Sequence, residues 1–357
     1  MLFERTDEQE MLTDTLTRFV VDAVKPHATA WSQSGQMPKD ALEGLRDLGL
    51  LGLELPESLG GAGFGSVEWV QALESLAAGD GGLALALVVH SVAASVLAGD
   101  EAAHGEVVQS LAAGEAFATL GWVDSRKEPV LAEADGDDLV LNGTKEAVAI
   151  AQQADWMLVR AALDDQEGFA WVSLSDAGLT IEPSAHGLGL RSAALCSVKL
   201  TKVRVSKAAW FGTDAVNAAR VHLDLGMAAL AVGLGAASLQ EGARYGMERK
   251  QFGKPIAMFQ ANQFKLADMV TENDGARLLV LRAALSRNAR EVDMARVFAA
   301  DAAFKAADHA LQLHGGYGFT EEFPVERFYR DAQFTTALFR TGDMLRSEIA
   351  TQLLEEV

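Results

Sequence analysis

The most constraining feature of the sequence is a residue periodicity that changes twice along the chain. Residues 1–117 carry apolar side chains at helical spacing, residues 118–212 contain short alternating or β-branched runs, and residues 213–357 return to helical spacing. The 357 residues are enough for two or three packed subdomains rather than one small core. The pattern predicts a mostly helical α+β protein with an N-terminal helical domain, a middle, mostly antiparallel β domain and a C-terminal four-helix bundle.

Local signals predict the elements of each region. The first region should hold helices over 10–24 and 39–48, a glycine-rich turn over 56–65 and a buried helix over 83–99. The last of these is apolar, but it contains serines and a histidine and is too short for a membrane span. The second region should hold strands over 139–144, 156–160, 169–174 and 198–205. The third should hold helices over 215–250, 258–288 and 292–314 and a last one before residue 357.

Composition excludes several classes of protein. The formal net charge of −20 leaves no basic stripe to neutralise phosphates, so a nucleic-acid partner is not expected. The single cysteine, Cys196, precludes an intrachain disulfide and is expected to be a buried small residue in a strand region. The N-terminus has no apolar signal core, and no histidine spacing suits a metal. These features together predict a cytoplasmic protein without a membrane span or a metal site.

Two stretches of the third region combine charge, aromatic rings and glycine. They are Tyr245-Gly-Met-Glu-Arg-Lys-Gln-Phe-Gly-Lys-Pro-Ile256 and Gln312-Leu-His-Gly-Gly-Tyr-Gly-Phe-Thr-Glu-Glu-Phe-Pro-Val-Glu-Arg-Phe-Tyr-Arg-Asp-Ala332. Arg249 and Phe252 would set a planar guanidinium and a ring beside a turn, which suits a pyrophosphate and a flavin or adenine. A cationic helix end with a glycine stop, and a plain cap at Gly315–Gly316, fit the same residues.

Both stretches resemble signature segments of acyl-CoA dehydrogenases. The resemblance extends over the whole chain, including the Leu-Pro-Glu-x-Leu-Gly-Gly loop near residue 56 and a predicted hairpin at Asn142-Gly-Thr-Lys145. It implies an α–β–α subunit of a tetramer that binds FAD and an acyl-CoA thioester, with an electron-transfer flavoprotein as a further partner. By the same resemblance, the residues that hold FAD are Arg249, Gln251, Phe252, Gln312, Gly315 and Gly316.

The chain departs from the family pattern where the chemistry requires a base. Most members carry the catalytic Glu in a Tyr-Glu-Gly-Thr stretch, and here the matching residues are Leu338-Phe339-Arg340-Thr341. Other members place the base on the preceding long helix, where this chain has Leu223. The next residue, Asp224, takes what is usually an Arg position. Because adjacent helix residues point about 100° apart, we expect a solvated surface aspartate there, with a displaced base as the alternative.

The expected flavin pocket of the β region is also altered. The family's Thr-Glu-Pro and Gly-Ser-Asp turns are replaced by the sequence over 121–129, and its Trp-Ile-Thr strand by Ala147-Val-Ala149. These changes remove stacking area and hydrogen-bonding groups.

The retained and lost groups fall into two sets. In the family's tetramer, each FAD is shared between two subunits. This chain resembles a subunit that kept the groups that grip a neighbour's dinucleotide and lost the groups that hold its own flavin. The sequence therefore predicts the catalytically depleted partner in a hetero-oligomeric acyl-CoA dehydrogenase that carries out α,β-dehydrogenation. Two alternatives stay open, an active homo-oligomeric FAD oxidoreductase with a relocated base or different chemistry, and a non-enzymatic scaffold or regulator.

Overall fold

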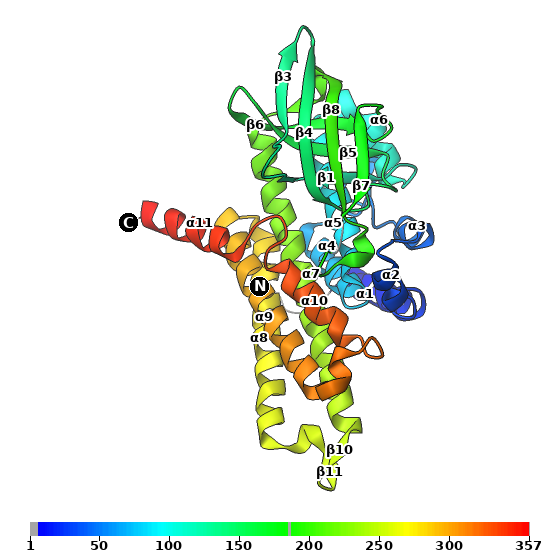
Figure 1. The fold of residues 1–357 in the computed structure, drawn as a ribbon, viewed down its shortest axis with the longest axis vertical. Helices are drawn as coiled ribbons and strands as arrows, with labels where there is room; N and C mark the ends of the chain where they lie inside the picture. The colour runs from blue at the N-terminus through cyan, green and yellow to red at the C-terminus, as the bar shows by residue number, and fades with distance from the viewer. Residues whose placement is uncertain (1–5, 185–186, 357) are drawn as a thin grey trace.

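The structure is a computed structural model that describes residues 6–184 and 187–356. Figure 1 shows a β domain at one end of the long axis, an N-terminal helical layer beside the centre, and long C-terminal helices that reach the other end. The N-terminal helices are α1 (Asp7–Phe19), α2 (Ala28–Ser34), α3 (Lys39–Asp47), α4 (Ser66–Ala77), α5 (Gly81–Ala98) and α6 (Glu101–Ala112). A single π-helical turn, Val20–Val24, continues α1 and ends before Pro26. The predicted helix–sheet–helix fold class is confirmed.

Helix α5 runs through the centre of the fold, as predicted for residues 83–99. Asp80 caps its first turn by accepting a hydrogen bond from the Leu83 amide at 2.9 Å. Both α5 and α7 (Thr213–Glu248) are long and apolar enough to cross a membrane, but 78% and 89% of their apolar windows are buried inside the protein. We therefore assign both as core helices.

The β domain is one twisted sheet in the order β7-β8-β4-β3-β5-β6-β9, with β1 added beside β5 and β2 beside β4. Its strands are β1 (Ala118–Gly121), β2 (Val123–Asp124), β3 (Leu131–Asp135), β4 (Asp138–Val148), β5 (Trp156–Leu163), β6 (Gln166–Ser173), β7 (Leu179–Pro183), β8 (Cys196–Ser206) and β9 (Trp210–Phe211). Only the β1–β5 and β3–β5 pairs are parallel among these strands. Cys196 is buried at the start of β8, as expected.

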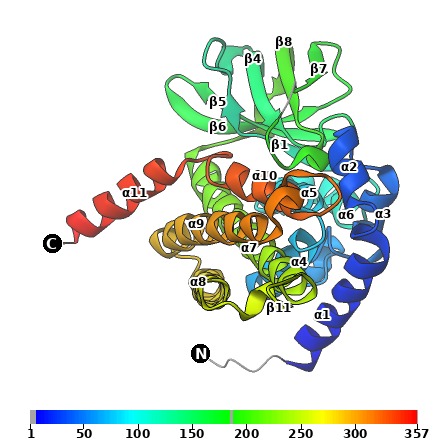
Figure 2. The same ribbon diagram turned by 60° about the horizontal axis from the view of Figure 1, so that its bottom comes forward.

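The C-terminal region contains α7, α8 (Gln260–Ser286), α9 (Ala289–His314), α10 (Val325–Thr335) and α11 (Gly342–Glu355). The first three pack side by side, and Figure 2 shows α11 starting on α9 and then projecting away from the body. A short hairpin, β10 (Lys250–Gln251) and β11 (Lys254–Pro255), joins α7 to α8. We propose domain boundaries near residues 117 and 212, where helix gives way to strand and strand to helix.

Three details differ from the sequence-based expectations. Helix α10 was missed, because its residues were read only as part of a motif. The strands β1, β3 and β7 and the helices α2, α4 and α6 had no individual prediction either. The predicted hairpin at Asn142–Lys145 is wrong, because these residues lie inside β4. A Cβ at Gly143 would come within 2.4 Å of the Pro129 carbonyl oxygen, so this glycine serves a close approach within the sheet.

A buried polar junction connects the three parts of the chain. Asp80 also accepts a hydrogen bond from Ser192, at 2.6 Å, and lies 3.6 Å from the Arg327 guanidinium of α10. Asp331, one turn further along α10, accepts a 2.6 Å hydrogen bond from the backbone amide of Leu190. Both carboxylates are fully or almost fully buried. The junction therefore fixes α5, the segment that precedes β8 and α10 relative to one another.

The Asp331 carboxyl should make stability depend on pH. Burial raises its pKa to about 6, despite the opposing effect of Arg327. A raised folded-state pKa means that its contribution to stability is present below the unfolded pKa and is lost as the pH rises through about 6. Asp331→Asn, which cannot ionise, should gain stability relative to wild type between pH 4 and pH 7, by up to about 3 kcal/mol. Urea unfolding across that range measures this, with the fully exposed Asp343→Asn as control. A difference independent of pH would contradict the assignment.

Candidate functional site

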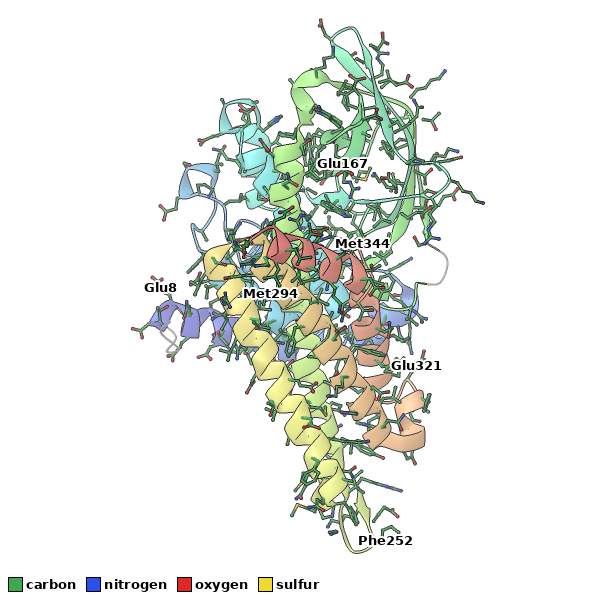
Figure 3. All side chains as sticks on the ribbon, turned by 90° about the vertical axis from the view of Figure 1, so that its left-hand side faces the viewer. Glu8, Glu167, Phe252, Met294, Glu321 and Met344 are labelled. Carbon is green, nitrogen blue, oxygen red and sulfur yellow. The ribbon has the colours of Figure 1, made fainter. Side chains whose placement is uncertain are left out.

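The first predicted motif forms an exposed hairpin at the far end of the molecule. Helix α7 ends at Glu248, and Arg249 leads into β10 with its side chain exposed. Phe252 and Gly253 form the turn with φ of 51° and 81°, and Phe252 is 94% exposed at the tip seen in Figure 3. Arg249 has no ion-pair partner among the residues that the structure describes. Its guanidinium is thus available to an external anion.

The second motif places two glycines beside this hairpin. Gly315 ends α9 with φ 60° and ψ −133°, a conformation that essentially only glycine adopts. Its role as a helix cap is therefore real. Gly316 is different, because it does not have a positive φ and a Cβ there would meet no atom within 4 Å. Neither backbone strain nor packing requires a glycine at position 316. Because glycine has no side chain, the Gly316 backbone is uncovered where it faces the pocket described next.

Two adjacent pockets bring the predicted cofactor residues together. A pocket of about 460 Å³ includes Arg249, Gln251, Gly315 and Gly316 in its lining. A neighbouring pocket of about 390 Å³ includes Gln251, Phe252 and Gln312. Gln251 contributes to both. All six residues predicted from sequence thus surround one continuous area at the C-terminal end of α7 and α9.

Aromatic side chains form the inner wall of the larger pocket. Tyr245 stacks on His314, with ring centroids 4.0 Å apart and planes 20° apart. The Nε2 atom of His314 lies 3.6 Å from Glu241, and His314 together with Arg244 lowers the pKa of Glu241 to about 2. Glu241 is therefore ionised, and the histidine ring is held through Nδ1, which lies 2.8 Å from the Ala310 carbonyl oxygen.

The sequence reasoning missed several lining residues of these pockets, Tyr245, Tyr317, Thr320, Asn262 and Lys265. The first three lie within the two quoted motifs, so their proximity to the site could have been inferred from the motif alone. Lys265 and Asn262 lie on α8 and carry no such signal.

The structure gives no free base at any of the three positions considered from sequence. Leu223 is fully buried in the core, and Phe339 packs against the same core with φ 65°. The expectation that Asp224 is a solvated surface residue is wrong, because it is only 1% exposed. Its position on the inner side of α7 comes from the packing of α9 and of the segment between α10 and α11 over it.

Asp224 is engaged in a buried cluster of ion pairs. Arg340 donates a hydrogen bond to Asp224 and another, at 2.9 Å, to Asp293. Arg296, also buried, lies 3.8 Å from Asp224. Burial raises the pKa of Asp224, while Arg340 and Arg296 oppose this shift. A carboxylate held between two guanidiniums and excluded from solvent is not available to remove a proton from a substrate.

The segment expected to face a flavin is also closed by local packing. Ala147 has φ 53° at an irregularity in β4, and Ala149 is fully buried with its carbonyl accepting a 2.6 Å hydrogen bond from Thr119. Lys145 forms a 2.5 Å ion pair with Asp124 in the same region. Burial lowers the pKa of Lys145 to about 8, opposed by Asp124. Residues 147–149 are Ala-Val-Ala and supply neither an aromatic ring nor a hydroxyl, and the neighbouring Lys145 is paired with Asp124.

Comparison with known proteins fits both the fold and the motifs. Residues 6–115 match the N-terminal domain of acyl-CoA dehydrogenases, and residues 199–354 match the C-terminal domain. The chain belongs to the acyl-CoA dehydrogenase family. A probable acyl-CoA dehydrogenase of Bacillus subtilis is 35% identical over 99% of this chain and 100% of its own length.

Solved acyl-CoA dehydrogenases share the complete architecture of this family member. Butyryl-CoA dehydrogenase from Megasphaera elsdenii is 26% identical with a TM-score of 0.94, covering 99% of this chain and 100% of its own. A glutaryl-CoA dehydrogenase from Mycobacterium smegmatis, solved with FADH2, is 25% identical with a TM-score of 0.92 and covers 98% of this chain and 95% of its own. The chain is thus an acyl-CoA dehydrogenase-family flavoprotein by descent, and its relatives bind FAD.

Removing the Asp224 charge should be costly if the carboxylate is structural. Asp224→Asn leaves the buried Arg340 and Arg296 without one of their counter-charges, so we expect a loss of about 3–5 kcal/mol of stability. Asp301→Asn, which breaks an exposed pair with Arg346, should cost less than about 1 kcal/mol. Denaturant unfolding of both variants measures the difference. Equal stabilities would show that Asp224 is not neutralised by these partners.

Proposed function

We propose that this chain is the catalytically depleted subunit of a hetero-oligomeric acyl-CoA dehydrogenase. In this role it completes the FAD site of a related subunit, and that subunit carries the base for α,β-dehydrogenation of an acyl-CoA thioester. When bound, FAD accepts the hydride that the reaction removes. The residues of this chain hold the dinucleotide half of the cofactor and take no part in proton abstraction.

The observation that carries the proposal is the position of the retained residues. The hairpin with Arg249 and Phe252 lies at the opposite end of the long axis from the chain's own β domain (Figure 1). A cofactor held by this hairpin would therefore meet the β domain of another polypeptide. The groups that reach outward are intact, while the positions that would serve an internal active site hold Phe339, Leu223 and a neutralised Asp224.

The chemistry of the paired pockets suits an ADP moiety. The unpaired Arg249 guanidinium offers a planar fork to a pyrophosphate. The open backbone at Gly316 permits close approach of the phosphates, and Phe252 offers an exposed ring for stacking. The pair Gln251 and Gln312 adds amide donors and acceptors to the same area. These donors fit an anionic dinucleotide.

The distribution of exposed apolar side chains favours an oligomer. Of the 17 large apolar side chains exposed in the described part of the chain, 13 lie at residue 247 or beyond. They include Phe264, Leu278 and Leu285 on α8 and Leu353 and Leu354 on α11. These side chains are distributed over the C-terminal helices, and we take their exposure as support for contacts with another subunit. We propose that the other subunit is a related dehydrogenase, and that an electron-transfer flavoprotein reoxidises the complex in a reducing cytoplasm.

The alternatives make different predictions about the chain on its own. An active homo-oligomer with a relocated base or different chemistry would carry flavin in its own β domain and would bleach when mixed anaerobically with a suitable acyl-CoA. A non-enzymatic scaffold would leave the turnover of every partner unchanged. The leading proposal requires neither flavin in the isolated chain nor an independent reaction.

The flavin content of the isolated chain separates these functions. We expect the full-length chain, purified without its partner, to be colourless, since its β domain lacks the wall and donors for an isoalloxazine. Absorbance at 450 nm relative to 280 nm measures this, before and after incubation with excess FAD. Co-purification with the related subunit should restore a yellow complex. Stoichiometric flavin in the isolated chain would contradict the proposal and favour the homo-oligomeric enzyme.

Within the complex, Arg249→Ala should weaken FAD retention. Loss of one charge-assisted contact to a phosphate corresponds to about 1.5–3 kcal/mol, or roughly a 10- to 100-fold higher Kd for FAD. Equilibrium dialysis of the reconstituted complex measures the Kd. Lys250→Ala removes the neighbouring cation of the same hairpin, which is not part of either pocket's lining, and should change the Kd little. Equal effects of the two substitutions would mean that Arg249 acts only through general charge.

A further inference from the structure

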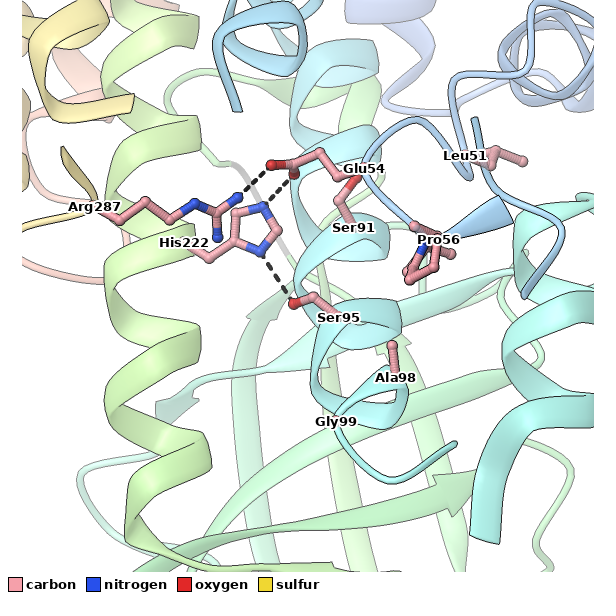
Figure 4. Close-up of a pocket in the computed structure, with 10 residues that line it drawn as sticks. Leu51, Glu54, Pro56, Ser91, Ser95, Ala98, Gly99, His222 and Arg287 are labelled. Atoms are coloured by element: carbon pink, nitrogen blue, oxygen red, sulfur yellow. Dashed lines mark hydrogen bonds and ion pairs between the residues drawn. The ribbon is translucent and has the colours of Figure 1, made fainter. Parts of the chain in front are cut away.

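A third pocket lies on another side of the molecule, away from the hairpin. It has a volume of about 270 Å³ and lies between the loop that contains Glu54, helix α5, helix α7 and the end of α8 (Figure 4). One wall is apolar, and the other carries hydroxyl, imidazole, carboxylate and guanidinium groups. Besides Glu54 and Ser95, the lining residues used below are Leu51, Leu55, Ser91, Ala98, His222 and Arg287.

Hydrogen bonds hold the polar wall in one arrangement. His222 lies 3.1 Å from the Ser95 hydroxyl through Nδ1 and 2.7 Å from Glu54 through Nε2. Arg287 donates to the other oxygen of Glu54 at 2.5 Å and to the Ser66 hydroxyl at 2.7 Å. Burial raises the pKa of Glu54, but His222 and Arg287 outweigh this effect and hold the pKa below its usual range. Glu54 is therefore ionised, with both oxygens occupied.

Arg287 occupies a backbone position that a side chain rarely adopts. It is the C-cap of α8 with φ 48°, in the left-handed region where glycine is favoured. A β-carbon at this position strains the backbone, so an arginine there is retained at a cost to stability. In this conformation the Arg287 guanidinium is held at the edge of the pocket by its hydrogen bonds to Glu54 and Ser66.

The polar groups of this wall that remain without a partner among the described residues are hydrogen-bond donors. Glu54 is already paired twice, so it has little attraction for an incoming cation. The Nη1 group of Arg287 has no partner among the described residues. The Ser91 hydroxyl accepts a 3.1 Å hydrogen bond from the Trp69 indole. The hydroxyl proton of Ser91 has no acceptor among the described residues either. Free donors beside an apolar wall of Leu51, Leu55 and Ala98 fit an anionic oxygen pair on a short aliphatic chain.

We propose that this pocket binds the carboxylate of a short aliphatic acid, with Arg287 and Ser91 as the donors. The carboxylate belongs either to a free acid or to the far end of an acyl chain that carries a second carboxyl group. The assignment does not depend on the FAD role of the hairpin. Its failure would leave that role untouched.

Binding of a matched acid and amide tests the proposal directly. Pentanoate and pentanamide have the same shape, and only pentanoate has the charge that Arg287 recognises. We expect isothermal titration of the full-length chain to give a Kd for pentanoate at least tenfold lower than for pentanamide. Arg287→Gln should abolish this preference, and Arg287→Lys should keep part of it. Adipate and its mono-thioester with pantetheine distinguish a free acid from the end of an acyl chain.

Two controls separate recognition from folding. Arg282→Gln removes another arginine of α8, paired with Glu291 on the surface, and should leave pentanoate binding unchanged. Ser91→Ala keeps the charge of the pocket and should weaken pentanoate several-fold, while circular dichroism confirms the native fold. The proposal is overturned if pentanoate and pentanamide bind equally, if neither binds, or if Arg287→Gln leaves the preference intact.

Discussion

The contacts of the buried Asp80 carboxylate are the interactions on which the arrangement of the N-terminal helices, the β domain and the C-terminal helices depends. One oxygen caps the central helix α5 and accepts the Ser192 hydroxyl, and the other lies near the Arg327 guanidinium. Burying an unpaired carboxylate would cost several kcal/mol, so all three partners must be present together. Glycine makes the approach possible, because a Cβ at Gly82 would come within 2.2 Å of the Ser192 hydroxyl. The junction therefore adds a polar connection between the helical layers and the sheet inside an apolar core that also contains Leu190 and Ala193.

The same physical device, a buried carboxylate paired with guanidinium groups, removes Asp224 from the candidates for a catalytic base. A catalytic carboxylate needs access to substrate and a pKa near the working pH. Asp224 has a counter-charge on Arg340, which itself replaces a glycine of the family pattern, and it is shielded from solvent. The two residues that depart from the family pattern, Asp224 on α7 and Arg340 after Phe339, form an ion pair with each other. Their pairing converts the region into a structural tie between α7 and the segment that leads to α11.

Local signals in the sequence predicted the long helices, the core helix α5 and the two motifs, because these depend on residues close together in the chain. Pairings between residues far apart in the chain could not be predicted from local sequence signals. Arg340 and Asp224 are 116 residues apart, and Glu54 and His222 are 168 residues apart. Neither pair has a signature until the fold brings its members together. The mistaken surface assignment of Asp224 had this cause, since the helical period gave its direction on α7 without showing what covers that face.

Under the proposed function, the hairpin residues and the β-domain residues of this chain contact two different FAD molecules. The hairpin with Arg249 lies at the opposite end of the molecule from the chain's own β domain (Figure 1), so in the proposed complex it contacts a cofactor seated in another polypeptide. In the same proposal, Phe339, Ala147 and Ala149 lie at positions that concern a cofactor bound to the chain's own β domain. One set of residues can therefore decay while selection on the neighbour's activity keeps the other. An enzyme that worked alone would place both sets of residues under the same constraint, so the loss of only one set is the pattern that the proposed division of labour requires.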